Sequence, residues 1–351
     1  MIANRRRQWL TVCLVASQAV RCNSSQYLHL VLASAIQSAR RHPCEYLSAC
    51  FTSGITFCFE TPRLRESSVG RQISSVHINT PTMMMDDPRG TPITTLIFDV
   101  DDTLYDVGTG FSDHRNTEGA PRFMVEHLGF STLASAKQLR DEYFDRYHST
   151  AKALSVAEQE GRFPPHAPKF DPNDLDTFFA TKLNFDLLGG KKERLANDLK
   201  ECQLNLVIFS NGPRNYVDRI LQELGLSKLF RPDRVWGVTD TLPYAKPQKE
   251  AFDQIFQQLG VPAQECVFIE DSMKNIRVGK SLGLHTVLVA GAGRLRKNRS
   301  ADVEVKRYDA PDEDDPAVDV TIETVEELRD VLPGLWESPP VFQPPEVKRL
   351  N

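Results

Sequence analysis

The stretch that decides the fold is Phe98-Asp99-Val100-Asp101-Asp102-Thr103-Leu104-Tyr105, which completes and follows an apolar run at residues 93–98. Such a run is typical of a buried parallel strand. In open α/β sheets ligands bind beyond the carboxyl ends of strands, and alternation along an extended segment puts Asp99 and Asp101 on the same side. One carboxylate can then attack an electrophile while the other transfers a proton. The competing interpretation is an acidic turn that ends a strand and caps a helix.

Three further segments follow in an order that favours the catalytic interpretation. The apolar run 206–209 ends in Ser210-Asn211-Gly212, which offers a small hydroxyl and an amide at another strand end. Lys246 precedes a segment with helical periodicity, and the apolar run 267–269 ends in Glu270-Asp271-Ser272. Each motif is weak by itself. The ordered set of two carboxylates, a small polar residue, a lysine and an acidic pair predicts one catalytic site.

This order resembles the four motifs of the haloacid dehalogenase-like hydrolase superfamily. The resemblance implies a phosphatase in which Asp99 is the nucleophile and Asp101 is the general acid and base. An aspartate at the second position speaks against a hydrolytic dehalogenase. The resemblance also implies that Ser210 and Asn211 donate to phosphate oxygens, and that Lys246 neutralises the phosphoryl group and keeps the nucleophile ionised.

The resemblance also implies a bound Mg²⁺, because two carboxylates cannot face a phosphate dianion without a cation. Mg²⁺ prefers an octahedral set of oxygen ligands. The ligands that the resemblance implies are Asp99, the backbone carbonyl of Asp101, and Asp271, with Glu270 as a direct or water-mediated ligand. Asn275 lies one helical turn after Asp271, where it is expected to orient that carboxylate.

The pattern of apolar segments predicts an α/β fold, a Rossmann-like parallel sheet core, because strands alternate with amphipathic helices after residue 94. Strands are expected at residues 95–100, 205–209, 234–238, 266–269, 285–289 and 318–322. Core helices are expected at residues 215–224, 248–259 and 273–282.

About 100 residues separate the first two expected strands, far more than the dozen or so that a crossover needs. This stretch resembles the inserted helical cap domain of the superfamily, which covers the site. The expected division is a core of residues 91–111 and 203–335 with a cap at 112–202. Helices are expected there at residues 120–128, 132–148, 150–161, 172–182 and 192–202.

Leu104-Tyr105 and Thr109-Gly110 resemble a pattern of the pyrimidine 5′-nucleotidase subgroup, which implies UMP or CMP as substrate. The chain departs from that subgroup at His148-Ser149, where a glycine and a threonine are expected, and in the spacer at residues 106–108. A phosphatase for phosphoglycolate or a sugar phosphate is the alternative, and a non-catalytic regulatory protein on a hydrolase scaffold is the alternative of another class. The cap, especially residues 147–151, is expected to recognise the leaving group.

Composition limits the partners. The chain of 351 residues has a net charge of -5, which offers no basic footprint for a nucleic acid polymer. No apolar run approaches the ~20 residues needed to cross a bilayer. The expected partner is therefore a small-molecule phosphomonoester, with neither nucleic acid nor membrane. The oligomeric state stays open, and a homo-oligomer is compatible with the sequence.

The two ends of the chain differ from the rest. The first 85 residues hold nine arginines, no lysine and three acidic residues, a composition typical of a transit peptide for a plastid or mitochondrion. The alternative is a cytoplasmic protein that starts at Met83-Met84-Met85. Residues 1–90 are accordingly expected to be a targeting or disordered segment outside the fold. The proline-rich tail at 336–351 is expected to be disordered.

Overall fold

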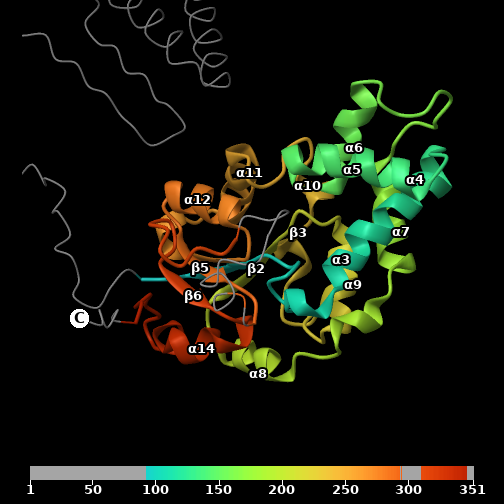
Figure 1. Ribbon diagram of the computed structural model, residues 1–351. Coiled ribbons are helices and arrows are strands. Elements are labelled where there is room, and N and C mark those ends of the chain that lie inside the picture. Colours follow the sequence, from blue (N-terminus) through green and yellow to red (C-terminus); the bar gives the residue numbers. More distant parts are fainter. Residues whose placement is uncertain (1–91, 293, 295–309, 346–351) are drawn as a thin grey trace, which may run out of the picture. The chain divides into compact units, whose positions relative to one another are not determined.

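The computed structural model of the chain describes residues 92–292, 294 and 310–345 (Figure 1). The N-terminal segment 1–90, which composition assigns to targeting, lies outside the described residues, and its interpretation stays a prediction.

Within the described residues, six parallel strands form one sheet in the order β3-β2-β1-β4-β5-β6. The strands are β1 (Thr95–Phe98), β2 (Asn205–Phe209), β3 (Val235–Trp236), β4 (Cys266–Glu270), β5 (His285–Val289) and β6 (Val320–Ile322). The predicted Rossmann-like core is therefore confirmed. The first strand is shorter than the predicted 95–100, because Leu104 N already donates to Val100 O at 3.0 Å and closes a turn.

Helices cover both faces of the sheet (Figure 1). One face packs against α8 (Glu193–Glu201), α9 (Arg214–Glu223) and α14 (Leu328–Val331). The other packs against α11 (Lys249–Leu259) and α12 (Met273–Ser281). Residues alternate between these layers along β1: Leu96 and Phe98 join the first core cluster and Ile97 joins the second. A further short helix, α10, spans Val238–Thr241.

Helix α8 corrects one predicted boundary. It was assigned to the cap at 112–202, but it packs against the core: Arg329 Nη1 donates to Asp198 Oδ1 at 3.0 Å, and Lys192 Nζ lies 2.9 Å from Glu326 Oε1. The physical reason is the crossover between the parallel strands β1 and β2, which needs a helix that lies on the sheet. The cap ends before this helix.

The inserted cap is helical, as predicted. It contains α3 (Phe111–His114), the π-helical turn η2 (Arg115–Gly119), α4 (Ala120–Leu128), α5 (Leu133–Tyr147), α6 (Thr150–Gln159) and α7 (Pro172–Lys182). The prediction missed α3 and η2, because their glycine, asparagine, aspartate and threonine residues have low helix propensity. No helix in the part of the chain that the structure describes is long and apolar enough to span a membrane.

The C-terminal tail differs from the prediction of disorder for residues 336–351. Ile93 N donates to Pro340 O at 3.1 Å, and Val341 forms an isolated bridge with Pro92. Val341 and Phe342 are both buried, because this apolar pair covers the start of the sheet. The prediction is thus wrong for residues 336–345, and residues 346–351 lie outside the described part.

The strand order fixes where a ligand binds. From β1 the chain moves through β2 to β3 on one side, and β4 to β6 lie on the other side, so the direction reverses between β1 and β4. In open parallel sheets the crevice for a ligand lies at such a reversal, beyond the carboxyl ends of the strands. The acidic residues that follow β1 and end β4 therefore meet at this point.

Candidate active site

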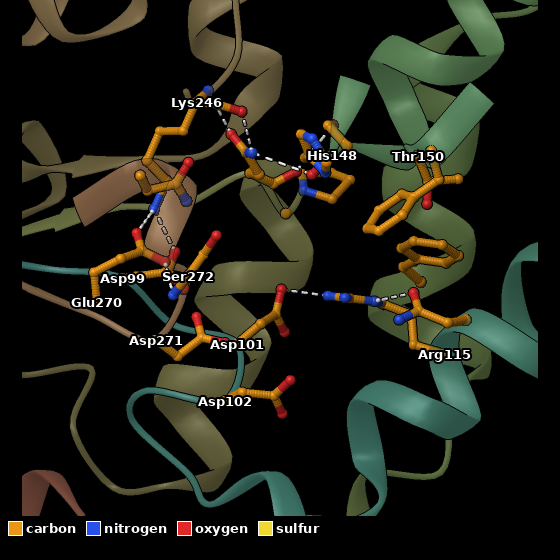
Figure 2. Close-up of a pocket in the computed structure, with 18 residues that line it drawn as sticks. Asp99, Asp101, Asp102, Arg115, His148, Thr150, Lys246, Glu270, Asp271 and Ser272 are labelled. Atoms are coloured by element: carbon orange, nitrogen blue, oxygen red, sulfur yellow. Dashed lines mark hydrogen bonds and ion pairs between the residues drawn. The ribbon is translucent and has the colours of Figure 1, made fainter. Parts of the chain in front are cut away.

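Asp99, Lys246 and Glu270 form the centre of the site (Figure 2). Lys246 Nζ donates to Asp99 Oδ1 and to Glu270 Oε2, each at 2.7 Å. The lysine is 1% exposed, and its ammonium also lies 5.2 Å from the ring centroid of Phe209. Three residues predicted from separate motifs are thus brought into one buried ion-pair network.

Burial governs the ionisation of this network. It raises the pKa of Asp99 to about 8, with help from the charge of Glu270 and against the opposing effect of Lys246. Burial, followed by the charge of Glu270, also raises the pKa of Asp271 well above its usual range. For Lys246 burial favours the neutral amine, but the charges of Asp99 and Glu270 outweigh it and raise the pKa. The site therefore carries more negative charge than one ammonium can balance.

The crowded carboxylates fit a divalent cation. Oxygens of Asp99, Glu270 and Asp271 all lie within 4.8 Å of one another. An all-oxygen donor set suits Mg²⁺, which keeps several waters. Among the described residues, Oδ1 of Asn275 and Oδ1 of Asp102 are buried without a hydrogen-bond partner. Such acceptors can bind the waters of a hydrated cation, so the residues predicted as metal ligands fit Mg²⁺.

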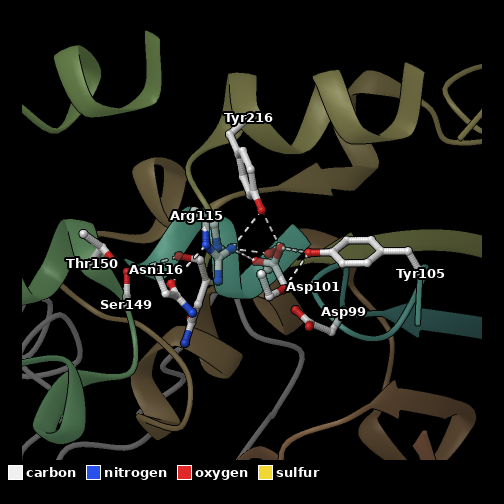
Figure 3. Close-up of polar contacts among 12 residues, drawn as sticks. Asp99, Asp101, Tyr105, Arg115, Asn116, Ser149, Thr150 and Tyr216 are labelled. Carbon is white, nitrogen blue, oxygen red and sulfur yellow. Dashed lines mark hydrogen bonds and ion pairs between the residues drawn. The ribbon is translucent and has the colours of Figure 1, made fainter. Parts of the chain in front are cut away.

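Asp101 lies beside this centre and is held by three donors (Figure 3). Tyr105 and Tyr216 each donate their hydroxyl to Oδ1, at 2.6 and 2.5 Å. The guanidinium of Arg115 pairs with Oδ2. Both oxygens of the predicted general acid and base are therefore occupied, and one of the donors comes from the cap segment η2.

Asp102 makes the turn that separates Asp101 from the following helix. Its φ of 58° is left-handed, a conformation that aspartate tolerates better than most residues. Burial raises the pKa of Asp102 to about 6, and the neighbouring charge of Asp101 adds to the effect. Asp102 lines the pocket with the other carboxylates, although the four motifs predict no role for it.

The two residues predicted to bind phosphate after β2 differ in what they contact. Ser210 is 1% exposed, its Oγ accepts from Gly212 N at 3.0 Å, and it does not line the pocket. Asn211 does line the pocket. Its side chain accepts from Lys246 N at 2.9 Å and donates to Lys246 O at 2.8 Å. The asparagine therefore fixes the position of the loop that carries Lys246.

A pocket of about 120 Å³ lies between core and cap. Its core wall carries the carboxylates and Lys246. Its cap wall is made by Arg115, Asn116, Phe144, His148, Ser149, Thr150 and Phe179. Four of these residues were not predicted as site residues, because no linear spacing relates them to the four motifs: Arg115, Asn116, Phe144 and Phe179. Only the packing of the cap on the core brings them to the site.

The segment at His148 and Ser149 joins the cap to the core. Ser149 Oγ donates to Asn211 O at 3.1 Å, and Asn211 Nδ2 donates to His148 O at 3.1 Å. Ser149 is 1% exposed. Its hydroxyl is therefore engaged by the core, which differs from the expectation that it contacts the leaving group.

We expect Ser149→Ala to lower kcat/KM about 3- to 10-fold for every substrate, since one neutral hydrogen bond between cap and core is lost. Steady-state kinetics on two phosphomonoesters with unlike leaving groups measure this. Ser155→Ala is the matched control, because Ser155 Oγ donates to Ala151 O within its own helix. A loss confined to one leaving group would show that Ser149 contacts substrate.

Residues 93–283 match the family described as haloacid dehalogenase-like hydrolase. A probable phosphoglycolate phosphatase of Pseudomonas savastanoi is 24% identical over 152 residues, 43% of this chain and 82% of that protein. A phosphoglycolate phosphatase of Pseudomonas syringae pv. tomato is 24% identical over 179 residues, 50% of this chain and 58% of that protein.

A third relative, a phosphoglycolate phosphatase of Colwellia psychrerythraea, is 34% identical over 89 residues, 25% of this chain and 38% of that protein. The chain thus spans most of the first relative and less than two thirds of the other two. Among solved structures, L-2-haloacid dehalogenase from Xanthobacter autotrophicus is 19% identical with a TM-score of 0.44, covering 69% of this chain and 99% of that chain.

Proposed function

The chain belongs to the haloacid dehalogenase-like hydrolases, and we propose that it is a Mg²⁺-dependent phosphatase that hydrolyses a small phosphomonoester through an aspartyl phosphate on Asp99. The observation that carries this proposal is the cluster at the strand reversal. There Asp99, Lys246 and the two acids that follow one another at residues 270–271 converge, with Asp101 alongside.

The residues divide the reaction into two easier steps. A phosphate monoester resists attack because its charge repels nucleophiles and its leaving alkoxide is poor. Attack by Asp99 forms an acyl phosphate, which water then hydrolyses. Asp101 protonates the leaving oxygen in the first step and takes a proton from the water in the second. Lys246, fixed by Asn211, offsets the charge of the phosphoryl group.

Mg²⁺ would be held by Asp99, Asp271 and the carbonyl of Asp101, and it would neutralise charge on the carboxylates and the phosphoryl oxygens. Glu270 has another task. Its Oε2 accepts from Lys246 Nζ, and its Oε1 accepts from Ser272 N at 3.2 Å. This favours Glu270 as the residue that orients the lysine, with contact to the metal through water.

There are two candidates for the substrate, a pyrimidine nucleotide and phosphoglycolate. The pyrimidine nucleotide candidate depends on Tyr105 and on Thr109-Gly110. Tyr105 is 1% exposed and its hydroxyl binds Asp101, while Thr109 Oγ1 accepts from Phe111 N at 3.3 Å. These residues support the general acid and the start of the cap. The names of the relatives support phosphoglycolate, and we place it ahead of UMP and CMP.

A substrate panel tests the proposal. Purified protein is assayed with phosphoglycolate, a sugar phosphate, UMP, CMP and p-nitrophenyl phosphate, in Mg²⁺ and in EDTA. We expect turnover of at least one phosphomonoester with Mg²⁺, loss of it in EDTA and recovery when Mg²⁺ is returned. Absence of turnover on every compound would favour the regulatory scaffold, and a clear preference for UMP and CMP would restore the nucleotide assignment.

We expect Mg²⁺ to raise the melting temperature more at pH 8 than at pH 6. The pKa of Asp99 is raised from 3.8 to about 8. The metal-free fold therefore keeps a proton that the unfolded chain releases, and its stability falls as pH rises from about 4 to about 8. Mg²⁺ must displace that proton, so its apparent affinity falls about tenfold for each pH unit below 8. Thermal melts at fixed Mg²⁺ measure the difference.

Asp99→Asn is the control for this prediction, because the amide neither titrates nor competes with a proton for the metal. Its Mg²⁺-induced shift should be smaller and should depend less on pH. Equal shifts at pH 6 and pH 8 in the wild type would contradict the assignment of Asp99 as a metal ligand with a raised pKa.

A further inference from the structure

Arg115 is a buried cation that the four motifs do not account for. It is 9% exposed and lines the pocket. Burial disfavours its charged form, but the charge of Asp101 outweighs this and holds the pKa of Arg115 well above the usual range. The guanidinium is therefore a permanent positive charge at the boundary between cap and core.

The contacts of Arg115 leave part of the guanidinium available. Nη1 donates to Asp101 Oδ2 and, at 2.9 Å, to the hydroxyl of Tyr216, and Nε donates to Asn116 Oδ1 at 3.3 Å. Nη2 makes no hydrogen bond within the described residues. Asp101 is the carboxylate with which Arg115 forms its ion pair. A second anion can therefore bind without first breaking every contact.

On the cap side, Arg115 lies beside the polar side chain of Asn116 (Figure 3). Asn116 Oδ1 also accepts from Arg140 Nη2 at 2.6 Å, so it joins two guanidinium groups. Arg140 is 4% exposed, lies 3.8 Å over the ring centroid of Phe144 and pairs with Asp141 at 3.1 Å. The pocket thus has an acidic core wall, and its cap wall carries the guanidinium of Arg115.

We propose that Arg115 anchors a second anion subsite, which binds a carboxylate or a second phosphate on the leaving group of the substrate. This rests on the proposed function, which puts the phosphoryl group at Asp99 and Lys246. Since Asp101 serves the leaving oxygen, the leaving group extends past it toward Arg115, which lies beyond Asp101 as seen from Asp99 (Figure 2). A planar guanidinium pairs with both carboxylate and phosphate through two parallel hydrogen bonds.

Binding of this second anion also affects Asp101. Arginine has hydrogen-bond donors and no acceptor. Its ion pair with Asp101 therefore occupies Oδ2, the oxygen that Asp101 would otherwise present to the leaving oxygen. When an anion on the substrate pairs with the guanidinium, Asp101 Oδ2 is released from Arg115 and can protonate the leaving oxygen. A neutral leaving group offers no such exchange, because separating a buried arginine from its carboxylate without another anion is strongly unfavourable. Arg115 therefore selects substrates with two anionic groups.

The test compares substrates that differ only in the second anion. Phosphoglycolate carries a carboxylate, ethylene glycol bisphosphate carries a second phosphate, and hydroxyethyl phosphate carries a neutral hydroxyl. We expect the wild type to prefer an anionic substrate in kcat/KM. Arg115→Gln should reduce that preference roughly 10- to 100-fold, as for the loss of a charged hydrogen bond. Arg115→Lys should keep more of it, and the preferred member of the two anionic substrates identifies the chemistry.

Two control variants distinguish a role of Arg115 in recognising the second anion from a role in supporting Asp101. Arg122→Gln removes an exposed arginine that pairs with Glu126 at 2.7 Å, and it should leave the preference unchanged. Tyr216→Phe removes a donor to Asp101 and keeps the guanidinium, so it should lower turnover of all three substrates alike. If Arg115→Gln also lowers all three alike, Arg115 serves only Asp101 or the phosphoryl group, and the proposal is overturned.

A binding measurement tests the Arg115 anion subsite independently of the proposed phosphatase activity. Calorimetric titration of phosphoglycolate and hydroxyethyl phosphate into Asp99→Asn with Mg²⁺ requires no turnover. We expect tighter binding of phosphoglycolate, and loss of the difference when Arg115→Gln is added. Equal binding of the two compounds to Asp99→Asn would overturn the subsite. Preferential binding without turnover by the wild type would support the subsite and reject the phosphatase.

Discussion

Asp99→Asn removes turnover, with an expected loss of at least about a thousandfold in kcat on any phosphomonoester. The amide is nearly isosteric with the carboxylate, so the hydrogen bond from Lys246 Nζ to Oδ1 can persist. It cannot form an acyl phosphate. Initial rates with saturating Mg²⁺ measure the loss, and mass spectrometry after acid quench of the wild type should find phosphate on the peptide that contains Asp99.

Asp113→Asn is the matched control, because Asp113 is exposed on α3. It should keep wild-type rates. Thermal melts establish that both variants fold. If Asp99→Asn keeps more than a few per cent of the wild-type rate, or if phosphate is found on another residue, Asp99 is not the nucleophile.

The core of this site could be predicted because parallel strands share one end. An apolar run that ends in acidic or small polar residues marks a strand and its carboxyl end, and the sheet then brings Asp99 and Glu270 together with Lys246. The strands at residues 205–209 and 285–289 matched the prediction to the residue. Asn205 and Ser210 bound the first apolar run, and Gly283 and Gly291 flank the second. Local sequence pattern is sufficient at these positions.

The cap side could not be predicted in the same way. Arg115 reaches Asp101 across 14 positions through a π-helical turn of residues with low helix propensity, and no periodic pattern marks such a turn. Ser149 was expected to contact the leaving group, yet its hydroxyl binds the backbone of Asn211. Both contacts depend on how the cap sits on the core, which is a matter of tertiary packing.

The tail shows the limit of composition as a guide. Four prolines in the last 15 residues suggested disorder, but Val341 and Phe342 are buried and Pro340 O accepts from Ile93 N. Proline lacks a donor and keeps its carbonyl, so it can still accept a hydrogen bond at the edge of a fold. Two apolar residues with a core surface to cover hold this stretch against the start of the sheet.

Asp101→Asn should lower kcat/KM for an alkyl phosphate by about 10²- to 10⁴-fold, the usual contribution of a general acid. With p-nitrophenyl phosphate the leaving group needs no proton, so attack by Asp99 should continue. Hydrolysis of the acyl phosphate still needs a base, and that step becomes slow. Rapid-mixing absorbance should therefore show a stoichiometric burst of nitrophenolate followed by slow turnover, whereas alkyl phosphates give no burst.

Tyr105→Phe and Tyr216→Phe test whether the effect belongs to Asp101 itself. Each removes one of the hydroxyls that bind Oδ1 and leaves the carboxylate in place, so each should cost about 3- to 10-fold with no burst. If Asp101→Asn lowers both substrates equally and shows no burst, the carboxylate only orients the cap through Arg115. A burst on p-nitrophenyl phosphate together with the loss on alkyl phosphates requires Asp101 to transfer protons in both steps, because only a group that serves both the leaving oxygen and the attacking water separates the two substrates in this way.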